Sequence, residues 1–131
     1  MDLQITDTTT RQFAEALLGL ETSGDTAPMG ALFTDDAPVL SIDGGPDRTG
    51  PSGIEELFTT YLAQFDRVRT TFTAVTEGTG RSALEWRSEA TVLGGRDVVY
   101  LGVTIIDLEG EKVSGFRTVY DSAALLDRPE A

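Results

Sequence analysis

Three amino acids are missing from this chain of 131 residues, and each absence excludes a kind of chemistry. Without cysteine there is no disulfide, no thiol nucleophile and no thiolate ligand for a metal. Without histidine the chain lacks the commonest general base, the Ser-His-Asp triad and most zinc and iron sites. Without asparagine it has no acceptor for N-glycosylation. Acid–base chemistry in this protein would have to use a carboxylate.

Basic residues are scarce, because 10 Lys and Arg stand against 22 Asp and Glu and give a net charge of −12. Binding to nucleic acid or to an anionic membrane surface requires clustered positive charge, so we expect neither partner. The N-terminal segment lacks the basic and apolar regions of a signal peptide. No apolar run approaches transmembrane length. We therefore expect a cytoplasmic protein.

Motifs for cofactors and metals are also absent. No D-x-D-x-D-G loop occurs, so the sequence predicts no metal site. Neither glycine-rich nucleotide motif is present, so it predicts no nucleotide cofactor. The stretch EGTGRS, residues 77–82, is interpreted as a hairpin turn and not as a phosphate loop.

The first half of the chain carries helical patterns. Threonines before Gln12 and a glycine at position 24 predict a helix with Phe13, Leu17 and Leu20 on one apolar face. Thr26 is expected to cap a short second helix, APMGALF. A capping-box pattern, Ser52 followed by Glu55, predicts a third helix over residues 52–66. Its apolar stripe consists of Ile54, Leu57, Phe58, Tyr61, Leu62 and Phe65.

Strand patterns fill the rest of the chain. A strand over residues 37–42 precedes a turn-rich stretch, and four longer segments rich in Val, Thr, Ile, Tyr and Phe follow Arg67. Short links that contain glycine predict antiparallel hairpins between these four segments. No internal repeat divides the chain, so we predict one domain over residues 1–131. Helices followed by strands indicate an α+β domain whose helices cover one face of a curved sheet.

Four stretches in this order, ALFTDDAPV, GIEELF, LEWR and LEGEKVSGFRTVYD, resemble the nuclear transport factor 2-like superfamily. Within it, the chain is similar to the SnoaL-like polyketide cyclase and ketosteroid isomerase-like branch, over roughly residues 8 to 126. The resemblance implies a cone in which a bent antiparallel sheet wraps around about three N-terminal helices and encloses an apolar pocket. It also implies a homodimer formed through the outer sheet face. Because this fold hosts isomerases, cyclases, epoxide hydrolases and binding modules, the resemblance does not settle function.

The catalytic residues of the isomerase and cyclase branches are not kept. The Tyr and the two Asp of the ketosteroid isomerases fall near Leu17, Ser41 and Gly102. The cyclases of this branch use an Asp and a His, and the chain has no histidine. Neither catalytic set can therefore be present as such.

The epoxide hydrolase set is also incomplete. Its Asp, Arg and Asp fall near Trp86, Ser88 and Thr118. A shift of one residue would bring Arg87 and Glu89 into the first two positions, but Thr118 replaces the last Asp in either register. Strand alternation places Arg87 and Glu89 on the outer face, where a surface charge network is the simpler interpretation.

Alternation along the strands, combined with the resemblance, predicts which side chains reach the pocket. Most are apolar or aromatic and a few carry hydroxyls, which suits a small, mostly hydrophobic ligand. The aromatic stripe could equally be a solid core with no cavity. The predicted ligand contacts are Phe13, Leu17, Ser41, Phe58, Tyr61, Trp86, Ser88, Tyr100, Thr104, Phe116 and Thr118.

Asp43, in the stretch VLSIDGG, is the candidate catalytic carboxylate. At the lip of an apolar pocket its pKa would rise toward neutrality, which would make it a usable acid or base. Tyr120 is the candidate partner that donates a hydrogen bond to a developing enolate or alkoxide, a role that Tyr61 or Tyr100 could also take. The glycines at positions 44 and 45 also suit an ordinary turn in which Asp43 is solvated.

Three functions remain open on the sequence. The first is a cofactor-free cyclase, isomerase or hydrolase that acts on a polyketide- or terpenoid-like substrate by acid–base catalysis. The second is a binding module for a small hydrophobic ligand, with no chemistry. The third is a dimeric accessory module whose pocket is filled by its own side chains.

Overall fold

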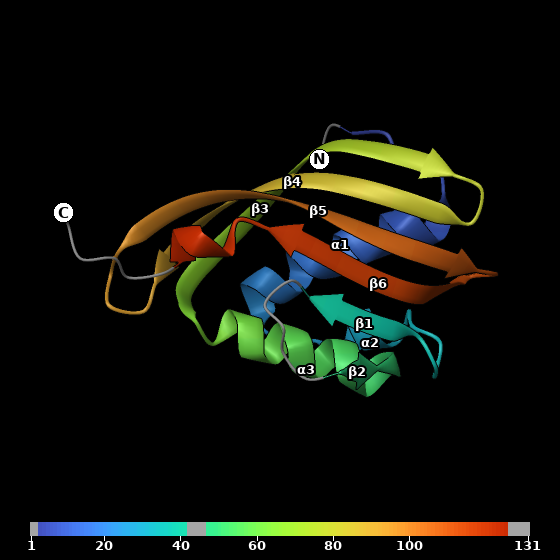
Figure 1. Cartoon of the computed structure of the whole chain (residues 1–131), viewed down its shortest axis with the longest axis horizontal. Helices are drawn as coiled ribbons and strands as arrows, with labels where there is room; N and C mark the ends of the chain where they lie inside the picture. Colours follow the sequence, from blue (N-terminus) through green and yellow to red (C-terminus); the bar gives the residue numbers. More distant parts are fainter. Residues whose placement is uncertain (1–2, 42–46, 126–131) are drawn as a thin grey trace.

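A six-stranded sheet covers three α-helices in the structure of this protein, a computed structural model that describes residues 3–41 and 47–125 (Figure 1). The sheet follows the order β2-β1-β6-β5-β4-β3. The elements are α1 (Thr8–Ser23), α2 (Ala27–Gly30), β1 (Pro38–Ser41), β2 (Arg48–Thr49), α3 (Gly50–Leu62), β3 (Phe65–Gly78), β4 (Arg81–Val92), β5 (Asp97–Glu109), β6 (Lys112–Tyr120) and the 3₁₀-helix η1 (Ser122–Leu125).

The predicted α+β class and the antiparallel meander β3-β4-β5-β6 are confirmed. β1 differs from the prediction because it pairs parallel with β6, with Val39 opposite Phe116 and Ser41 opposite Thr118. A parallel pair needs a long connection, and α3 together with four strands separates β1 from β6 in the chain. The sheet is therefore mixed at this end.

Irregularities in the strand pairing bend the sheet over the helices. The register shifts between Phe65 and Arg67 and between Phe72 and Ala74 in β3, and again after Asp107 in β5. Such bulges bend a strand and increase its twist. Figure 1 shows the long strands β3 to β6 curving over α1 and α3, so that the concave face encloses the core.

A side-chain hydrogen bond and a glycine set the two ends of α1. Its N-cap is Asp7, whose carboxylate accepts a hydrogen bond from the Thr10 amide at 2.7 Å, and not one of the threonines. A carboxylate accepts more strongly than a hydroxyl at this position, which has exposed amide hydrogens and a positive dipole end. Gly24 ends the helix in the left-handed conformation, with φ of 75°, as predicted.

The other two helices are shorter at their C-terminal ends than the sequence predicts. α2 begins at Ala27 as predicted but ends at Gly30, and α3 ends at Leu62, so that Phe65 belongs to β3.

The Thr26 hydroxyl does not cap α2, because it donates to Glu55 of α3 at 3.0 Å. Glu55 is therefore engaged between helices and forms no capping box with Ser52. α3 instead begins at Gly50, directly before Pro51, because proline is well tolerated in a first helical turn.

The core fills the space between the helices and the concave face of the sheet. Inward positions alternate along the strands, as Leu84, Trp86, Ser88 and Ala90 of β4 do. Within the described residues no helix is both long enough and apolar enough to span a membrane. The largest fully buried side chains include Phe13, Leu20, Met29, Ile54, Leu84, Ile106 and Val113.

Gly102 of β5 makes room for the one tryptophan of the chain. It lies opposite Trp86 on one side and Tyr120 on the other. A Cβ atom at position 102 would overlap the indole ring of Trp86. The glycine thus lets the largest side chain of the concave face lie flat against the sheet.

We expect Gly102→Ala to lower the free energy of unfolding by about 1–3 kcal/mol, because overpacking forces the indole out of its place. Urea unfolding gives the stability, and the fluorescence of the single tryptophan reports its displacement. The matched control is Gly78→Ala in β3, where the nearest atom to the new Cβ lies at an ordinary 3.5 Å. Equal stability and unchanged fluorescence of the two variants would contradict this account of Gly102.

Candidate functional site

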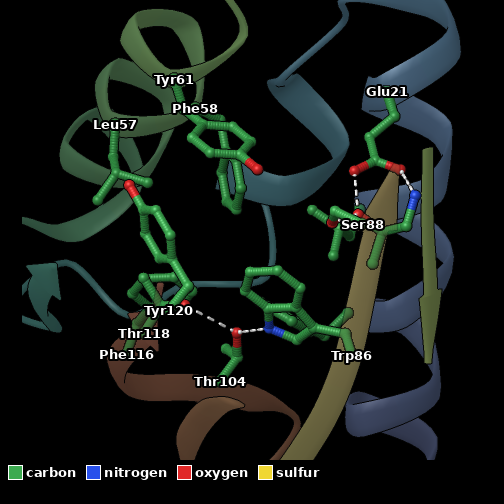
Figure 2. A pocket seen from close by; sticks show the side chains of 13 residues that line it. Glu21, Leu57, Phe58, Tyr61, Trp86, Ser88, Thr104, Phe116, Thr118 and Tyr120 are labelled. Atoms are coloured by element: carbon green, nitrogen blue, oxygen red, sulfur yellow. Dashed lines mark hydrogen bonds between the residues drawn. The ribbon is translucent and has the colours of Figure 1, made fainter. Parts of the chain in front are cut away.

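A cavity opens between α1, α3 and the concave face of β3 to β6 (Figure 2). The side chains around it come from two helices and four strands that are far apart in the sequence. Most of them are apolar or aromatic, and one carries a carboxyl group. The lining consists of Phe13, Leu17, Glu21, Leu57, Phe58, Tyr61, Thr70, Trp86, Ser88, Thr104, Phe116, Thr118 and Tyr120.

Most of the described residues chosen from the sequence come together here, and two, Tyr100 and Ser41, do not. Tyr100 is buried in contact with Tyr61 and Trp86, but is not itself part of the lining. Ser41, at the end of β1, stands opposite Thr118 outside the lining. Asp43 lies outside the described residues, so its role stays a prediction.

The sequence reasoning missed Glu21, Leu57 and Thr70. Glu21 follows Leu17 by four residues, a spacing that places both on one side of α1. Thr70 lies between Val68 and Phe72 in β3 and points inward with them. Helical spacing and strand alternation could have found both.

Thr70 holds the carboxyl group of Glu21 with both of its donors. Its backbone N–H donates to Oε1 at 2.8 Å, and its hydroxyl donates to Oε2 at 2.5 Å (Figure 2). The Thr70 hydroxyl also lies 2.7 Å from the hydroxyl of Ser88, its direct partner across β3 and β4. One threonine therefore fixes the orientation of the carboxyl group.

Burial raises the pKa of Glu21, because the apolar surroundings disfavour the charged form. The two hydrogen bonds from Thr70 act in the opposite direction and limit the rise of this pKa. Within residues 3–41 and 47–125 no arginine or lysine forms an ion pair with Glu21. A raised pKa with no cationic partner is typical of an acid–base group in a catalytic site.

Two tyrosines lie beside the end of the cavity that holds the carboxyl group of Glu21. The hydroxyl of Tyr61 is hydrogen-bonded to the hydroxyl of Tyr100. Burial raises the pKa of Tyr61 far above its ordinary value, and the pKa of Tyr100 to about 12. Both phenols therefore keep their hydrogens at neutral pH and can donate hydrogen bonds.

A second set of polar side chains lies next to Trp86 and extends across β4, β5 and β6. The indole Nε1–H of Trp86 donates to the hydroxyl of Thr104 at 2.9 Å, and this hydroxyl lies 3.1 Å from that of Thr118 (Figure 2). Thr104 and Thr118 are direct partners across β5 and β6. These contacts fix the indole ring, which forms one wall of the cavity.

The cavity is narrow. It leaves about 40 Å³ for the centres of water molecules, where roughly 10–15 Å³ is enough for one water. It accepts a few waters or a small chemical group as it stands. A drug-sized ligand would need some 300–1,000 Å³, so such a ligand must displace side chains from the lining.

The charged residues of β4 lie on the other side of the sheet. The guanidinium of Arg87 contacts the carboxylate of Glu89 at 2.5 Å, and both side chains are exposed. These residues form the surface charge pair expected from alternation and do not reach the cavity. Among the described residues no group of three acidic side chains is arranged to hold a metal ion.

Comparison with known proteins identifies the fold. The profile of the SnoaL-like domain matches residues 11–116. An NTF2-like protein from Anabaena variabilis aligns with a TM-score of 0.79 and 17% identity, covering 95% of this chain and 98% of the other. A candidate polyketide cyclase from Acidithiobacillus ferrooxidans gives 0.78 and 14% identity over 94% of both chains. An LEH-like epoxide hydrolase of M. tuberculosis gives 0.68 and 14% identity, with 90% and 86% covered.

No curated protein matches the chain. The structural relatives are too different in sequence to show more than the fold. The family and fold that were inferred from the sequence motifs are confirmed.

We expect Glu21→Gln to remove a pH-dependent loss of stability. The folded protein holds the Glu21 proton more tightly than the unfolded chain, since burial raises this pKa above its ordinary 4.5. Stability from this group is therefore lost as pH rises from about 4.5 through the folded pKa. The stability of Glu21→Gln relative to wild type should increase over this range in denaturant unfolding at a series of pH values.

The matched control for this substitution is Glu15→Gln, an exposed glutamate of the same helix. Its unfolding free energy should run parallel to that of the wild type. A constant difference between Glu21→Gln and wild type at all pH values would contradict a raised pKa at Glu21.

Proposed function

The chain belongs to the SnoaL-like domain family, and on that premise we propose that it is a cofactor-free enzyme that moves a proton on a small, mostly apolar substrate. The substrate is a carbonyl or epoxide compound of polyketide- or terpenoid-like character, bound in the cavity of Figure 2, and the reaction is an isomerisation, cyclisation or hydrolysis. We place this reaction in the cytoplasm on the sequence expectation alone. The observation that carries the proposal is Glu21, a carboxyl group inside an aromatic cavity with no cation beside it among the described residues.

The chemistry follows from the position of this carboxyl group. A carboxylate in apolar surroundings binds a proton more strongly than one in water, so it is a stronger base. The two hydrogen bonds from Thr70 leave each Glu21 oxygen with one unused lone pair, which can accept a substrate proton. A phenol of the tyrosine pair would donate to the oxygen on which negative charge develops.

Two catalytic residues predicted from the sequence, Tyr120 and Asp43, remain part of this proposal. Tyr120 lines the cavity, with its ring centroid 6.0 Å from that of Trp86 and 5.8 Å from that of Tyr100, and is a second phenol able to act on a substrate oxygen. Asp43 remains a candidate base from the sequence pattern. Glu21 and Asp43 are therefore rival carboxylates, and a direct comparison separates them.

Turnover tests the proposal on a panel of small ketones, enones and epoxides. If Glu21 is the base, Glu21→Gln should lower turnover of the best substrate by about 10²–10⁴-fold, the usual contribution of a general base. Asp43→Asn and the exposed control Glu15→Gln should each retain most of the activity. Loss in Asp43→Asn with activity kept in Glu21→Gln would transfer the role to Asp43.

A binding module without chemistry is the second candidate, and the narrowness of the cavity favours it. In that case, small apolar compounds would raise the melting temperature by mass action, and none would be converted. Thermal shifts with the same panel, followed by product analysis, distinguish the two functions. Binding without turnover across the panel favours the module.

We further propose that two copies pair through the outer sheet face. Apolar side chains gather there on β1, β5 and β6 and are about half exposed or more, namely Leu40, Val99, Leu101 and Val119. The charged pair Arg87–Glu89 lies on the same face. Twofold pairing of identical subunits is the commonest arrangement of soluble oligomers, and this surface offers both apolar area and charges of both signs.

We expect Leu101→Asp to shift the protein from dimer to monomer, because it places a charge at the most exposed of these four apolar side chains. Sedimentation velocity measures the change. The matched control is Leu93→Asp, since Leu93 is 60% exposed and Leu101 is 63% exposed, but Leu93 lies in the turn after β4. A wild type that sediments as a monomer would contradict the dimer.

A further inference from the structure

We propose that the cavity binds a small organic ammonium ion, whose positive charge pairs with the carboxylate of Glu21 and whose alkyl groups pack on the surrounding aromatic rings. This inference goes beyond the proposed function, because it concerns a ligand that is held by its charge and requires no turnover. It names a chemical class of ligand that the apolar lining alone does not indicate.

Glu21 is an acidic group without a positive neighbour. Its two oxygens accept hydrogen bonds from the backbone N–H and the hydroxyl of Thr70, at 2.8 and 2.5 Å, and both donors are neutral. Among the described residues no lysine or arginine lines the cavity or forms an ion pair with Glu21. An unpaired charge out of water is costly, and a cation beside it offsets this cost. The carboxylate therefore favours a positively charged ligand over a neutral one of the same shape.

Aromatic rings form a large part of the cavity wall. Six of the thirteen lining residues are aromatic, so a ligand beside Glu21 meets ring faces and not only aliphatic groups. The faces of such rings attract cations, because the π electrons make them negative. Figure 2 shows several of these rings around the same cavity as the Glu21 carboxyl group. Neighbouring ring centroids lie 6.0–6.4 Å apart along the series Phe13, Phe116, Phe58, Tyr61, Tyr120 and Trp86.

The size of the cavity limits the ligand to a compact ion. Its space of about 40 Å³ for water centres holds about three or four waters, since one water needs roughly 10–15 Å³ by this measure. A water occupies about 30 Å³ in the liquid, so the same space holds roughly 100 Å³ of ligand, or a branched ion of about five heavy atoms. A small alkylammonium ion matches this space.

An inorganic cation suits this lining less well. Calcium and magnesium take about six or more oxygen ligands, which are mostly carboxylates, carbonyls and waters. Glu21 supplies the one carboxylate of the described lining, and in residues 3–41 and 47–125 no group of three acidic side chains is arranged for a metal. Alkyl groups, in contrast, gain from contact with the rings. The net charge of −12 also attracts cations to the protein.

A bound ammonium ion would compete with the reaction proposed above. Its N–H groups would donate to the lone pairs of Glu21 that a substrate proton would otherwise use. Its positive charge would also stabilise the ionised carboxyl group, which opposes the effect of burial on the pKa of Glu21. A molecule of this class would therefore inhibit the proposed reaction and would not be its substrate.

The test compares two probes that share one shape and differ in charge. The probes are tert-butylammonium and tert-butanol, which have the same branched alkyl body and a polar group that donates hydrogen bonds. Only the amine is positive at neutral pH, since an alkylammonium group has a pKa near that of lysine, about 10.4. Titration calorimetry on the full chain at constant ionic strength gives both affinities. In the wild type we expect the ammonium ion to bind at least about tenfold more tightly than the alcohol.

Glu21→Gln keeps the size of the side chain and removes its charge. We expect it to weaken the binding of tert-butylammonium at least about tenfold and to change that of tert-butanol less than about twofold. The matched control is Glu15→Gln, which removes an exposed charge of the same helix and should leave both affinities as in the wild type.

Phe58→Leu tests the contribution of the rings, because it keeps an apolar side chain at a lining position and removes the aromatic face. We expect the affinity for tert-butylammonium to fall about two- to fivefold relative to that for tert-butanol. The fluorescence of the single tryptophan, which lines the cavity, reports whether each probe binds there.

Equal affinities of the two probes in the wild type would overturn the proposal, and so would a lack of measurable binding of either probe. Unchanged ammonium binding in Glu21→Gln, or the same loss in Glu15→Gln, would mean that the net charge of the chain attracts the ion, and would overturn it as well. The comparison of the probes needs only the wild type, so it decides the question even if a variant does not fold.

No substrate is present in this experiment, which keeps it separate from the test of the proposed function. If the ammonium ion does not bind, proton transfer by Glu21 is still judged from the turnover of Glu21→Gln. If no compound of the panel is converted, the affinities of the two probes still decide whether the cavity holds a cation.

Discussion

The site depends on the two hydrogen bonds that Thr70 donates to the carboxyl group of Glu21. They join α1 to β3 at the wall of the cavity and hold a carboxyl group in apolar surroundings. Hydrogen bonds to a charged group contribute about 1.5–3 kcal/mol each, while removal of an ion from water costs several kcal/mol. No described cation offsets this cost. A glutamate kept at such a position is difficult to explain as a stabilising feature, and this favours a role in chemistry.

Strand register organises the remaining polar groups. Thr70, Ser88 and Tyr100 stand opposite one another across β3, β4 and β5, and Thr104 stands opposite Thr118 across β5 and β6. Neighbouring hydroxyls on one face of a sheet can satisfy each other, so these buried polar groups have partners in a mostly apolar cavity. The cavity therefore has one polar end at the carboxyl group of Glu21, and another that fixes the indole of Trp86.

The fold identifies the family, whereas the proposed reaction depends on the residues of the site. The family match shows a SnoaL-like domain, and structural relatives include a candidate polyketide cyclase and an epoxide hydrolase. Their sequence identity of 14% gives no residue role for this chain, and the same cone supports several reactions. The reaction proposed for this chain depends instead on Glu21 and its neighbours.

The sequence by itself determined the α+β class, the helix face at Phe13 and Leu17, the four hairpin strands and the inward set Trp86 and Ser88, because these follow from local periodicity. It placed the start of α3 wrongly, since Glu55 bonds Thr26 across two helices, a contact that no local pattern contains. Only the tertiary structure joined Glu21 to Thr70, which are 49 residues apart, and set β1 parallel to β6. Burial raises the pKa of a glutamate only after α1 has packed on the sheet, so the sequence alone could not distinguish Glu21 from the surface acids.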